Sequence, residues 1–195
     1  MTQYEKLKLS LRYYLLGKGW YVAVDALEYA ESIHTGMRKD GVTPEFEHQI
    51  RIAHYLRSLD CMYPEETIAA ALLHDVREDY HVADRELTRR FGPTITTSCI
   101  LLDKNGKEHD AYFCGIADDA IASLAKGGDR IHNLQTMVGV FSREKQLKYV
   151  NEVRTQFFPM LKQARRAFPQ QERAYENIKH MLESQIELIE VINHE

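Results

Sequence analysis

Apolar residues recur at helical spacing along almost the whole chain, and no segment alternates between apolar and polar positions as a half-buried strand does. Stripes of this kind lie on one helical face in residues 22–33, 50–59 and 175–192. Counting such stripes predicts an all-α fold, a helical bundle of roughly eight to ten helices.

The most apolar segment follows a clear helix start. Pro64 suits a first helical turn, and the two glutamates behind it suit the positive end of the helix dipole. Residues 68–73 are then apolar on every side, which predicts a buried central helix. Asp84 is expected to cap the next helix, which should stop at Gly92-Pro93.

The second half of the chain also favours helices. Residues 103–110 predict a polar surface loop, and residues 116–137 predict a helix in which Gly127-Gly128 is an awkward interruption. A long helix is expected over residues 142–167, and Pro169 should open the last one.

Length and composition support this picture. The 195 residues suit one domain, since single cores usually cover roughly 100–200 residues. Hydrophobic residues make up 44% and charged residues 28%, a balance that excludes disordered and fibrous chains. Glycine (10) and proline (5) are scarce, which favours long elements with short connections.

Charge and cysteine usage exclude several classes of partner. A net charge of −4 argues against a general nucleic-acid binder. No apolar run reaches the roughly 20 residues of a membrane span, and the first residues lack a signal-peptide profile. The 3 cysteines are scattered without a C-x-x-C pair, which argues against a disulfide framework or a zinc ribbon. We therefore expect a cytoplasmic protein.

A His-Asp pair stands directly behind the apolar run, where polar groups need partners. Glu78 lies four residues after His74, and Asp79 lies four residues after Asp75. On a helix, both acids would therefore lie on the same face as the His-Asp pair and close to it. Crowded carboxylates are costly unless a cation lies among them. A divalent metal explains this pattern better than a salt-bridge network, although a bare His-Asp pair is more often structural.

Further ligands for such a metal must come from elsewhere in the chain. Upstream candidates are His34, His48 and His54, and downstream candidates are Asp129 and His132. Taken singly, each of these residues is more often structural or solvated than a ligand.

Four motif blocks in order give a more specific signal. The blocks are Ala30-x-x-x-His34-x-Gly36-x-Arg38-x-x-Gly41, Thr43-Pro44-Glu45-Phe46-Glu47-His48, Ala70-Ala71-Leu72-Leu73-His74-Asp75-Val76-x-Glu78-Asp79 and Lys126-x-x-Asp129-Arg130-Ile131-His132-Asn133-Leu134-x-Thr136-Met137. With them the chain resembles the HD-domain hydrolases of the RelA/SpoT homologue family, most closely the stand-alone small alarmone hydrolases. The resemblance places a motif core at about residues 22–137 and packing helices at about 142–193, within a single domain over residues 1–195.

The resemblance implies a role for each motif residue. The implied metal ligands are His48, His74, Asp75 and Asp129. Mixed imidazole and carboxylate ligands suit Mn²⁺, with Fe²⁺, Mg²⁺ or Zn²⁺ as alternatives. The implied catalytic acids are Glu78 and Asp79, which would handle the attacking water and its proton. The implied substrate contacts are Arg38, Lys39, Asn133 and Thr136. His34 and His132 are expected to pack against the site. For Lys126 and Arg130, a structural ion pair is as good an expectation as a role in the site.

The implied activity is hydrolysis of the ribose 3′-pyrophosphate of guanosine tetra- or pentaphosphate, which gives GDP or GTP and pyrophosphate. The chain has no room for a synthetase domain, so hydrolysis without synthesis is expected. Gln135 stands where the large members often have arginine, which leaves base recognition open.

Three alternatives remain at this point. The first is an HD-fold phosphohydrolase that acts on an adenosine alarmone, NADPH or another nucleotide. The second is a non-catalytic nucleotide sensor, and the third is a helical bundle that pairs with a partner. The expected partner is a small nucleotide, with no nucleic acid and no membrane. A homo-oligomer is possible if the last helix is shared.

Overall fold

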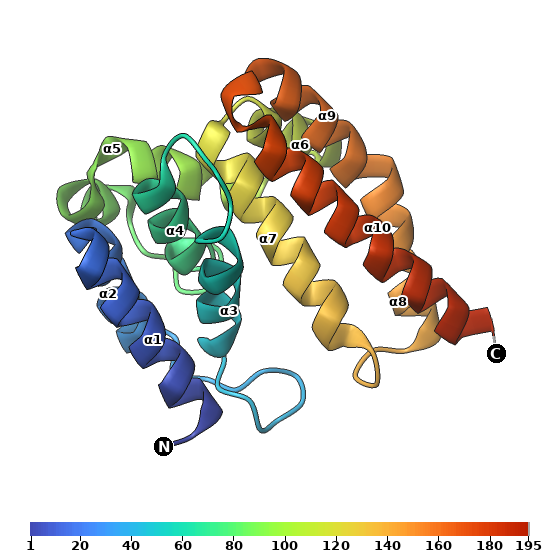
Figure 1. Cartoon of the computed structure of the whole chain (residues 1–195), viewed down its shortest axis with the longest axis horizontal. Helices are drawn as coiled ribbons and strands as arrows, with labels where there is room; N and C mark the ends of the chain where they lie inside the picture. Colours follow the sequence, from blue (N-terminus) through green and yellow to red (C-terminus); the bar gives the residue numbers. More distant parts are fainter. Residues whose placement is uncertain (195) are drawn as a thin grey trace.

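The computed structural model describes residues 1–194, which form ten α-helices and no β-strand (Figure 1). The helices are α1 (Gln3–Lys18), α2 (Tyr21–Ile33), α3 (Glu47–Leu56), α4 (Pro64–Leu73), α5 (Asp84–Leu102), α6 (His109–Ala117), α7 (Ala120–Met137), α8 (Arg143–Glu152), α9 (Phe158–Ala167) and α10 (Glu172–His194). A π-helical turn (Val153–Phe157) joins α8 to α9, and a 3₁₀ turn (Pro169–Gln171) precedes α10. The all-α prediction is confirmed.

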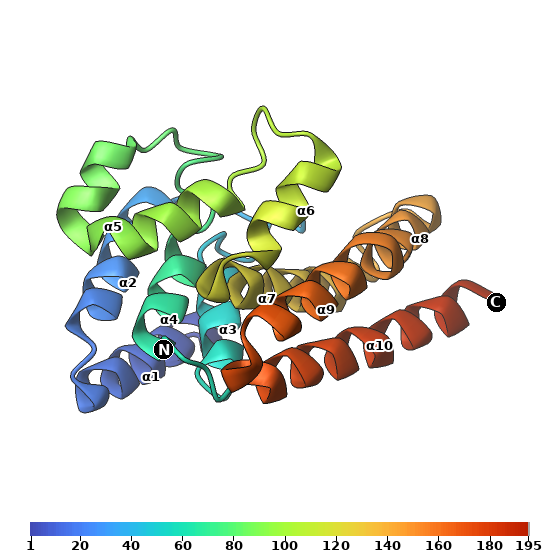
Figure 2. The same cartoon turned by 90° about the horizontal axis from the view of Figure 1, so that it is seen from above.

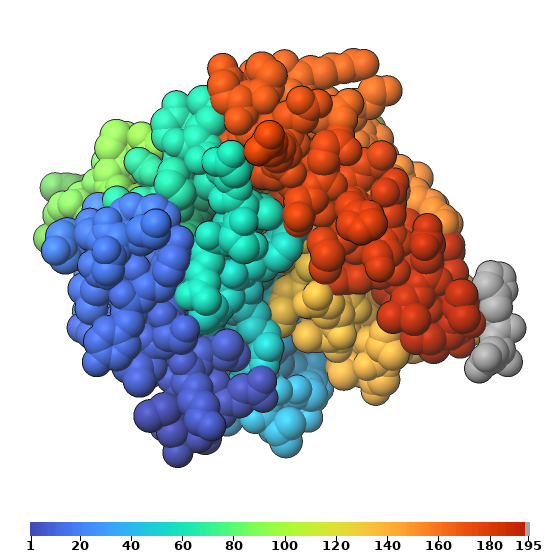
Figure 3. Space-filling view, viewed as in Figure 1, coloured from blue at the N-terminus to red at the C-terminus, as the bar shows by residue number. Residues whose placement is uncertain are grey.

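The helices surround α7, with α1 to α5 on one side of it and α8 to α10 on the other (Figures 1 and 2). Two hydrophobic clusters fill the interior. One joins the N-terminal helices through side chains such as Leu11, Ile50 and Leu72. The other joins α7 to the C-terminal helices and also takes up Ile52 and Leu56 of α3. Helix α3 therefore faces both clusters, and the C-terminal half of α7 is visible between α3 and α10 (Figure 3).

Helix α4 is the buried central helix that its composition predicts. Every residue from Thr67 to Leu73 is buried, and the helix packs against α2, α3, α5 and α7. Pro64 occupies its first turn, where a missing backbone N–H costs nothing. The end of α4 is thus held firmly from several sides.

The two consecutive glycines do not interrupt α7, because both are packing positions. A Cβ on Gly127 would lie 2.8 Å from Cγ2 of Ile178 on α10, and one on Gly128 would lie 3.0 Å from Cγ2 of Ile52 on α3. The lack of side chains lets α7 approach both neighbours closely.

Two predicted boundaries are wrong. Asp84 is the first residue of α5 rather than its cap, which is Ala83. The stop expected at Gly92-Pro93 is present as a kink, where the two helical segments of α5 meet. At the kink Gly92 has φ 83°, a conformation that glycine adopts without strain. The helix expected over residues 116–137 is two helices, because Asp119 caps a new one by accepting hydrogen bonds from the backbone N–H groups of Ile121 and Ala122.

Helix α1 was not foreseen, although its signal is local. Thr2 and Glu5 form a capping box, and Gly19 ends the helix in the left-handed conformation. Among residues 1–194, no helix has the length and hydropathy needed to cross a lipid bilayer.

Candidate metal centre

His74 stands immediately after α4, where the burial of the helix fixes its ring. Its Nδ1 lies 2.8 Å from the carbonyl oxygen of Ala71, which can only accept, so Nδ1 carries a proton and donates it. Its Nε2 then faces Asp75 Oδ2 at 3.0 Å and Asp129 Oδ1 at 3.9 Å. This arrangement fixes the ring orientation that a metal-ligating histidine needs.

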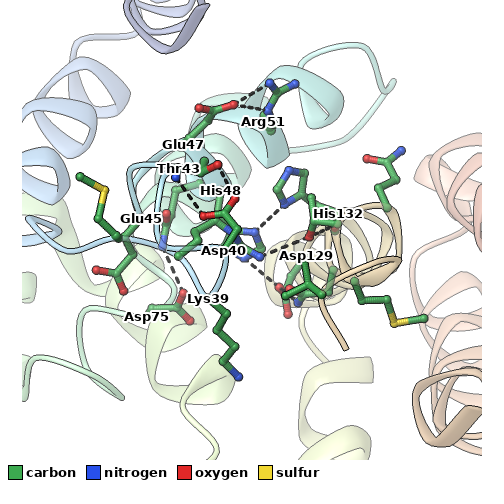
Figure 4. Close-up of a pocket in the computed structure, with 18 of the residues that line it drawn as sticks. Lys39, Asp40, Thr43, Glu45, Glu47, His48, Arg51, Asp75, Asp129 and His132 are labelled. Atoms are coloured by element: carbon green, nitrogen blue, oxygen red, sulfur yellow. Dashed lines mark hydrogen bonds and ion pairs between the residues drawn. The ribbon is translucent and has the colours of Figure 1, made fainter. Parts of the chain in front are cut away.

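His48 lies in the first turn of α3 and joins the same group. Its Nε2 is 3.1 Å from Asp129 Oδ1, and its Nδ1 is 2.7 Å from Nδ1 of His132 on α7. Figure 4 shows the His48 ring between these two partners. When His48 is the donor to His132, its Nε2 keeps a lone pair directed at the position between His48 and Asp129.

Asp129 extends from the middle of α7, and three side chains besides His74 hold its carboxylate. Oδ1 accepts hydrogen bonds from Asn133 Nδ2 at 2.5 Å and contacts His48, and Oδ2 accepts one from Lys126 Nζ at 3.0 Å. The ion pair between Lys126 and Asp129 is the structural alternative that the sequence left open. Arg130 likewise pairs with Glu152 at 2.6 Å and faces away from the group.

Three of the four expected ligands form one tight group. His48, His74 and Asp129 each offer one ligand atom, and these atoms lie within 4.8 Å of one another. Asp75 borders the group without joining it, and its Oδ2 accepts a hydrogen bond from Gln49 Nε2 at 3.1 Å. Gln49 follows His48 directly, and its role was not foreseen from the sequence.

The pKa values of these residues indicate that the group favours bound positive charge. Burial disfavours the charged form of His74, but the carboxylates of Asp75 and Asp129 outweigh it and raise the pKa of His74 to about 9. Burial also opposes ionisation of Asp75, yet His74 lowers the pKa of that carboxyl to about 2. Burial lowers the pKa of His48, and burial together with His48 lowers that of His132 to about 3. Without a metal, the Lys126 ammonium and a proton on His74 would compensate the charge of the two carboxylates.

These residues fit a divalent cation. Two imidazole nitrogens and a carboxylate oxygen are a donor set that such ions accept. The carboxylates already retain a proton on a deeply buried imidazole, which a metal would displace on binding. The described residues therefore hold a His/Asp group with the chemistry of a metal site.

The acidic pair lies beside the group, but not on a continuous helix. Helix α4 ends at Leu73, and residues 74–80 form turns in which the Asp79 N–H still donates to the Asp75 carbonyl oxygen at 2.9 Å. Glu78 Oε2 accepts a hydrogen bond from the backbone N–H of Lys104 at 3.1 Å. Burial and the neighbouring Asp75 raise the pKa of Asp79. The expected proximity is present, although the turn geometry replaces the expected helix.

A cavity of about 650 Å³ opens onto these groups. Its lining includes the candidate residues His48, Asp75, Glu78, Asp79, Asp129, Arg38, Lys39, Asn133 and Thr136. Nine of the ten candidate site residues therefore meet at one cavity, and the tenth, His74, contacts it through Asp75 and Asp129.

Two cations of the cavity lining, Arg38 and Lys39, come from residues 36–45, a hairpin-like loop between α2 and α3 that we call the 36–45 loop. The Arg38 N–H donates to the Thr43 carbonyl oxygen at 2.8 Å, and the Glu45 N–H donates to that of Gly36 at 2.9 Å. Arg38 also donates to Thr136 Oγ1 on α7 at 3.3 Å. Within residues 1–194 neither Arg38 nor Lys39 pairs with a carboxylate, so both charges are available to an anion.

A comparison with family models matches residues 26–98 to a family described as the HD domain. This interval contains both candidate histidine ligands and the acidic pair. Residues 26–98 of this chain are thus similar to the HD domain.

Curated relatives connect this chain to alarmone enzymes. It is 30% identical over 178 residues to the GTP pyrophosphokinase rsh of Brucella melitensis, an alignment that covers 82% of this chain and 22% of the relative. It is 29% identical over 144 residues to guanosine-3′,5′-bis(diphosphate) 3′-pyrophosphohydrolase of Aquifex aeolicus, and 29% identical over 144 residues to a probable enzyme of the same name in Synechocystis. These two alignments cover 69% and 68% of this chain and 20% and 19% of the relatives. The chain thus spans about a fifth of the length of the relatives that it matches.

Proposed function

We propose that this chain is a metal-dependent hydrolase that removes the ribose 3′-pyrophosphate from guanosine tetra- or pentaphosphate. The observation that carries the proposal is one cavity that unites the His48, His74 and Asp129 group, the acidic pair and two unpaired cations. The names of two relatives agree with this chemistry.

The residues that would hold the metal are His48, His74 and Asp129, with Asp75 as a fourth ligand after a small movement. Their mixed nitrogen and oxygen donors favour Mn²⁺. A bound divalent cation supplies a Lewis acid for phosphate oxygens and acidifies a water molecule.

The two acids of the pair receive different roles in this proposal. Glu78 is held by the Lys104 amide, so it suits the orientation of an attacking water. Among the described residues, no hydrogen bond holds the Asp79 side chain, and its pKa is raised by burial and by Asp75, so it suits proton transfer. The water oxygen would bond to the phosphorus next to the ribose while the bond from that phosphorus to the 3′-oxygen breaks. Asp79 would take the proton of the water and pass it to the leaving 3′-oxygen, which releases pyrophosphate.

The cations account for substrate binding by a chain of net charge −4. Arg38 and Lys39 extend from the 36–45 loop into the cavity, where they would neutralise phosphate charge. Asn133 and Thr136 line the facing wall on α7, one helical turn apart, and would contact the nucleoside.

The decisive experiment incubates the chain with guanosine tetraphosphate and Mn²⁺ and measures released pyrophosphate. We expect turnover that a chelator abolishes and that falls by about 10³-fold or more in H74A and D129A, because each removes a ligand. No turnover by the wild-type chain, or full turnover by both variants, would contradict the proposal.

A substrate panel separates the alternatives. The adenosine 3′-pyrophosphates and NADPH test the other phosphohydrolase activities, and nucleotide binding without turnover would identify a sensor. Incubation with ATP and GDP tests the expectation that this chain does not synthesise the alarmone.

A further inference from the structure

The 36–45 loop is attached to the rest of the molecule by a contact that joins it to the acidic turn. The Tyr80 hydroxyl donates to Glu45 Oε2 at 2.6 Å. Tyr80 directly follows Asp79, and Glu45 is the last residue of the loop. One hydrogen bond therefore connects the segment that carries the acids to the segment that carries Arg38 and Lys39.

The loop is internally stiff, so its base determines where its tip lies. Met37 and Pro44 pair as an isolated antiparallel bridge. At the tip, Asp40 Oδ1 accepts hydrogen bonds from the backbone N–H groups of Val42 and Thr43 at 3.0 and 2.9 Å. A small rotation at Glu45 would thus move Arg38 and Lys39 as one body.

The surroundings of the Glu45 carboxylate fix its position. A Cβ on Gly36 would lie 2.9 Å from Glu45 Oε2, so the glycine leaves room for the carboxylate. The buried ring of His34 packs edge-on against Tyr80, with ring centroids 4.8 Å apart, and stacks on Phe46 at 5.7 Å. The Tyr80 ring is therefore held by His34, which is held in turn by Phe46.

We propose that Tyr80 and Glu45 are positioning residues that set the distance between the phosphate-binding cations and the acidic pair. Neither residue is a candidate ligand or catalytic acid. Glu45 borders the cavity, but its carboxylate is occupied by the Tyr80 hydroxyl. The inference rests on the proposed function, because the reaction needs the pyrophosphate bound by the loop at a fixed place relative to the acids.

The test compares Y80F with Y29F, which is a matched control. Tyr29 donates to Glu86 Oε1 at 2.5 Å far from the cavity lining, so Y29F loses the same kind of hydrogen bond elsewhere. In Y80F and E45A we expect kcat/KM for guanosine tetraphosphate to fall about tenfold. Both constants should change, because a loosened loop binds phosphate less tightly, which raises KM, and holds it less accurately against the acids, which lowers kcat. The double variant should be no worse than either single variant, since the pair acts as a unit. E45Q, which keeps an oxygen acceptor, should restore most of the kcat/KM.

Hydrogen exchange gives a readout that does not depend on turnover. We expect the amides of residues 36–45 to exchange faster in Y80F and E45A than in the wild type and Y29F. Unchanged kcat/KM and unchanged exchange in Y80F, or equal changes in Y29F, would overturn the positioning role. If the wild-type chain releases no pyrophosphate, the proposed function fails, while faster exchange of the loop in Y80F would still support the anchor itself.

Discussion

Asp129 illustrates how single residues build this site. Its carboxylate contacts His48, Asn133 and Lys126 and lies 3.9 Å from His74. Lys126 and the two histidines keep its pKa well below the usual range although burial acts in the opposite direction. A buried carboxylate with two cationic neighbours, Lys126 and His74, could exchange one of them for a metal ion.

The Lys126 side chain should therefore be most important when no metal is bound. Its buried ammonium compensates Asp129, and removal of one partner of a buried ion pair costs about 3 kcal/mol or more. We expect K126M to unfold at a clearly lower temperature than the wild type in chelator, with much of the loss recovered in Mn²⁺. Calorimetry measures both values, and K148M, which alters an exposed lysine, serves as control. An equal loss with and without Mn²⁺ would refute this explanation.

His54 predicts a pH dependence of stability away from the metal group. Burial lowers its pKa and outweighs the contact of Nε2 with the Leu7 carbonyl oxygen at 2.9 Å, which acts in the opposite direction, so the folded state favours the neutral ring. The stabilisation is complete above the unfolded-state pKa of about 6.5 and declines as the pH falls below it, because the unfolded state then binds more protons.

Urea unfolding at about pH 8 and about pH 5.5, on either side of that unfolded-state pKa, measures the effect. We expect H54Q to lose less stability on acidification than the wild type, whereas H180Q, an exposed site, should behave like the wild type. The same loss in all three proteins would exclude His54 as a cause.

At the level of helices, α7 depends on close approach to its neighbours. Gly127 faces Ile178 of α10, and Gly128 faces Ile52 and Leu56 of α3. The helix thereby holds Asp129, the next residue, against His48 of α3. The glycines that look unfavourable for a helix are the positions that place a ligand.

A methyl group at Gly127 should separate α7 from α10. We expect G127A to destabilise the fold by about 1–3 kcal/mol through overpacking. G17A is the matched control, because Gly17 lies in α1 with no atom within 4 Å of its added Cβ, and there alanine should stabilise by about 0.5–1 kcal/mol. Chemical denaturation compares the two variants, and a neutral G127A would show that α10 adapts easily.

The helices that carry an apolar stripe could be predicted from the sequence, whereas several of the positions where helices begin and end could not. The buried run at residues 68–73 predicted α4, and the helix expected over residues 142–167 covers α8, the π-helical turn and α9. The Gly92-Pro93 pair marked the kink in α5, whereas the N-cap at Asp119 was missed because the segments on both sides of it are helical.

The whole molecule brings its candidate ligands together from separate helices. His48 belongs to α3, His74 follows α4, and Asp129 belongs to α7, with α3 in contact with both hydrophobic clusters. These three residues were predicted together because each stands in one of the ordered motif blocks on which the family resemblance rests. The support from Gln49 and the anchor at Tyr80 depend on three-dimensional proximity, so no linear spacing revealed them.

A cation at this point should stabilise the fold as a whole. Binding to the folded state alone adds about 2.7 kcal/mol when the free ion is at 100 times its Kd. We expect Mn²⁺ to raise the unfolding temperature of the wild type and to have no such effect on H74A or D129A. H109A, which changes an exposed histidine, should keep the shift. A shift that persists in D129A would place the ion elsewhere.

The matched HD interval ends at residue 98, whereas the carboxylate at Asp129 lies beyond it on α7. The nitrogen donors and one oxygen donor of the centre therefore lie in different stretches of the gene. Recombination between relatives anywhere in this gap would combine imidazoles of one lineage with a carboxylate of another. We expect such an exchange to keep the candidate site only where the two glycines still allow α7 to approach α3 and α10 closely.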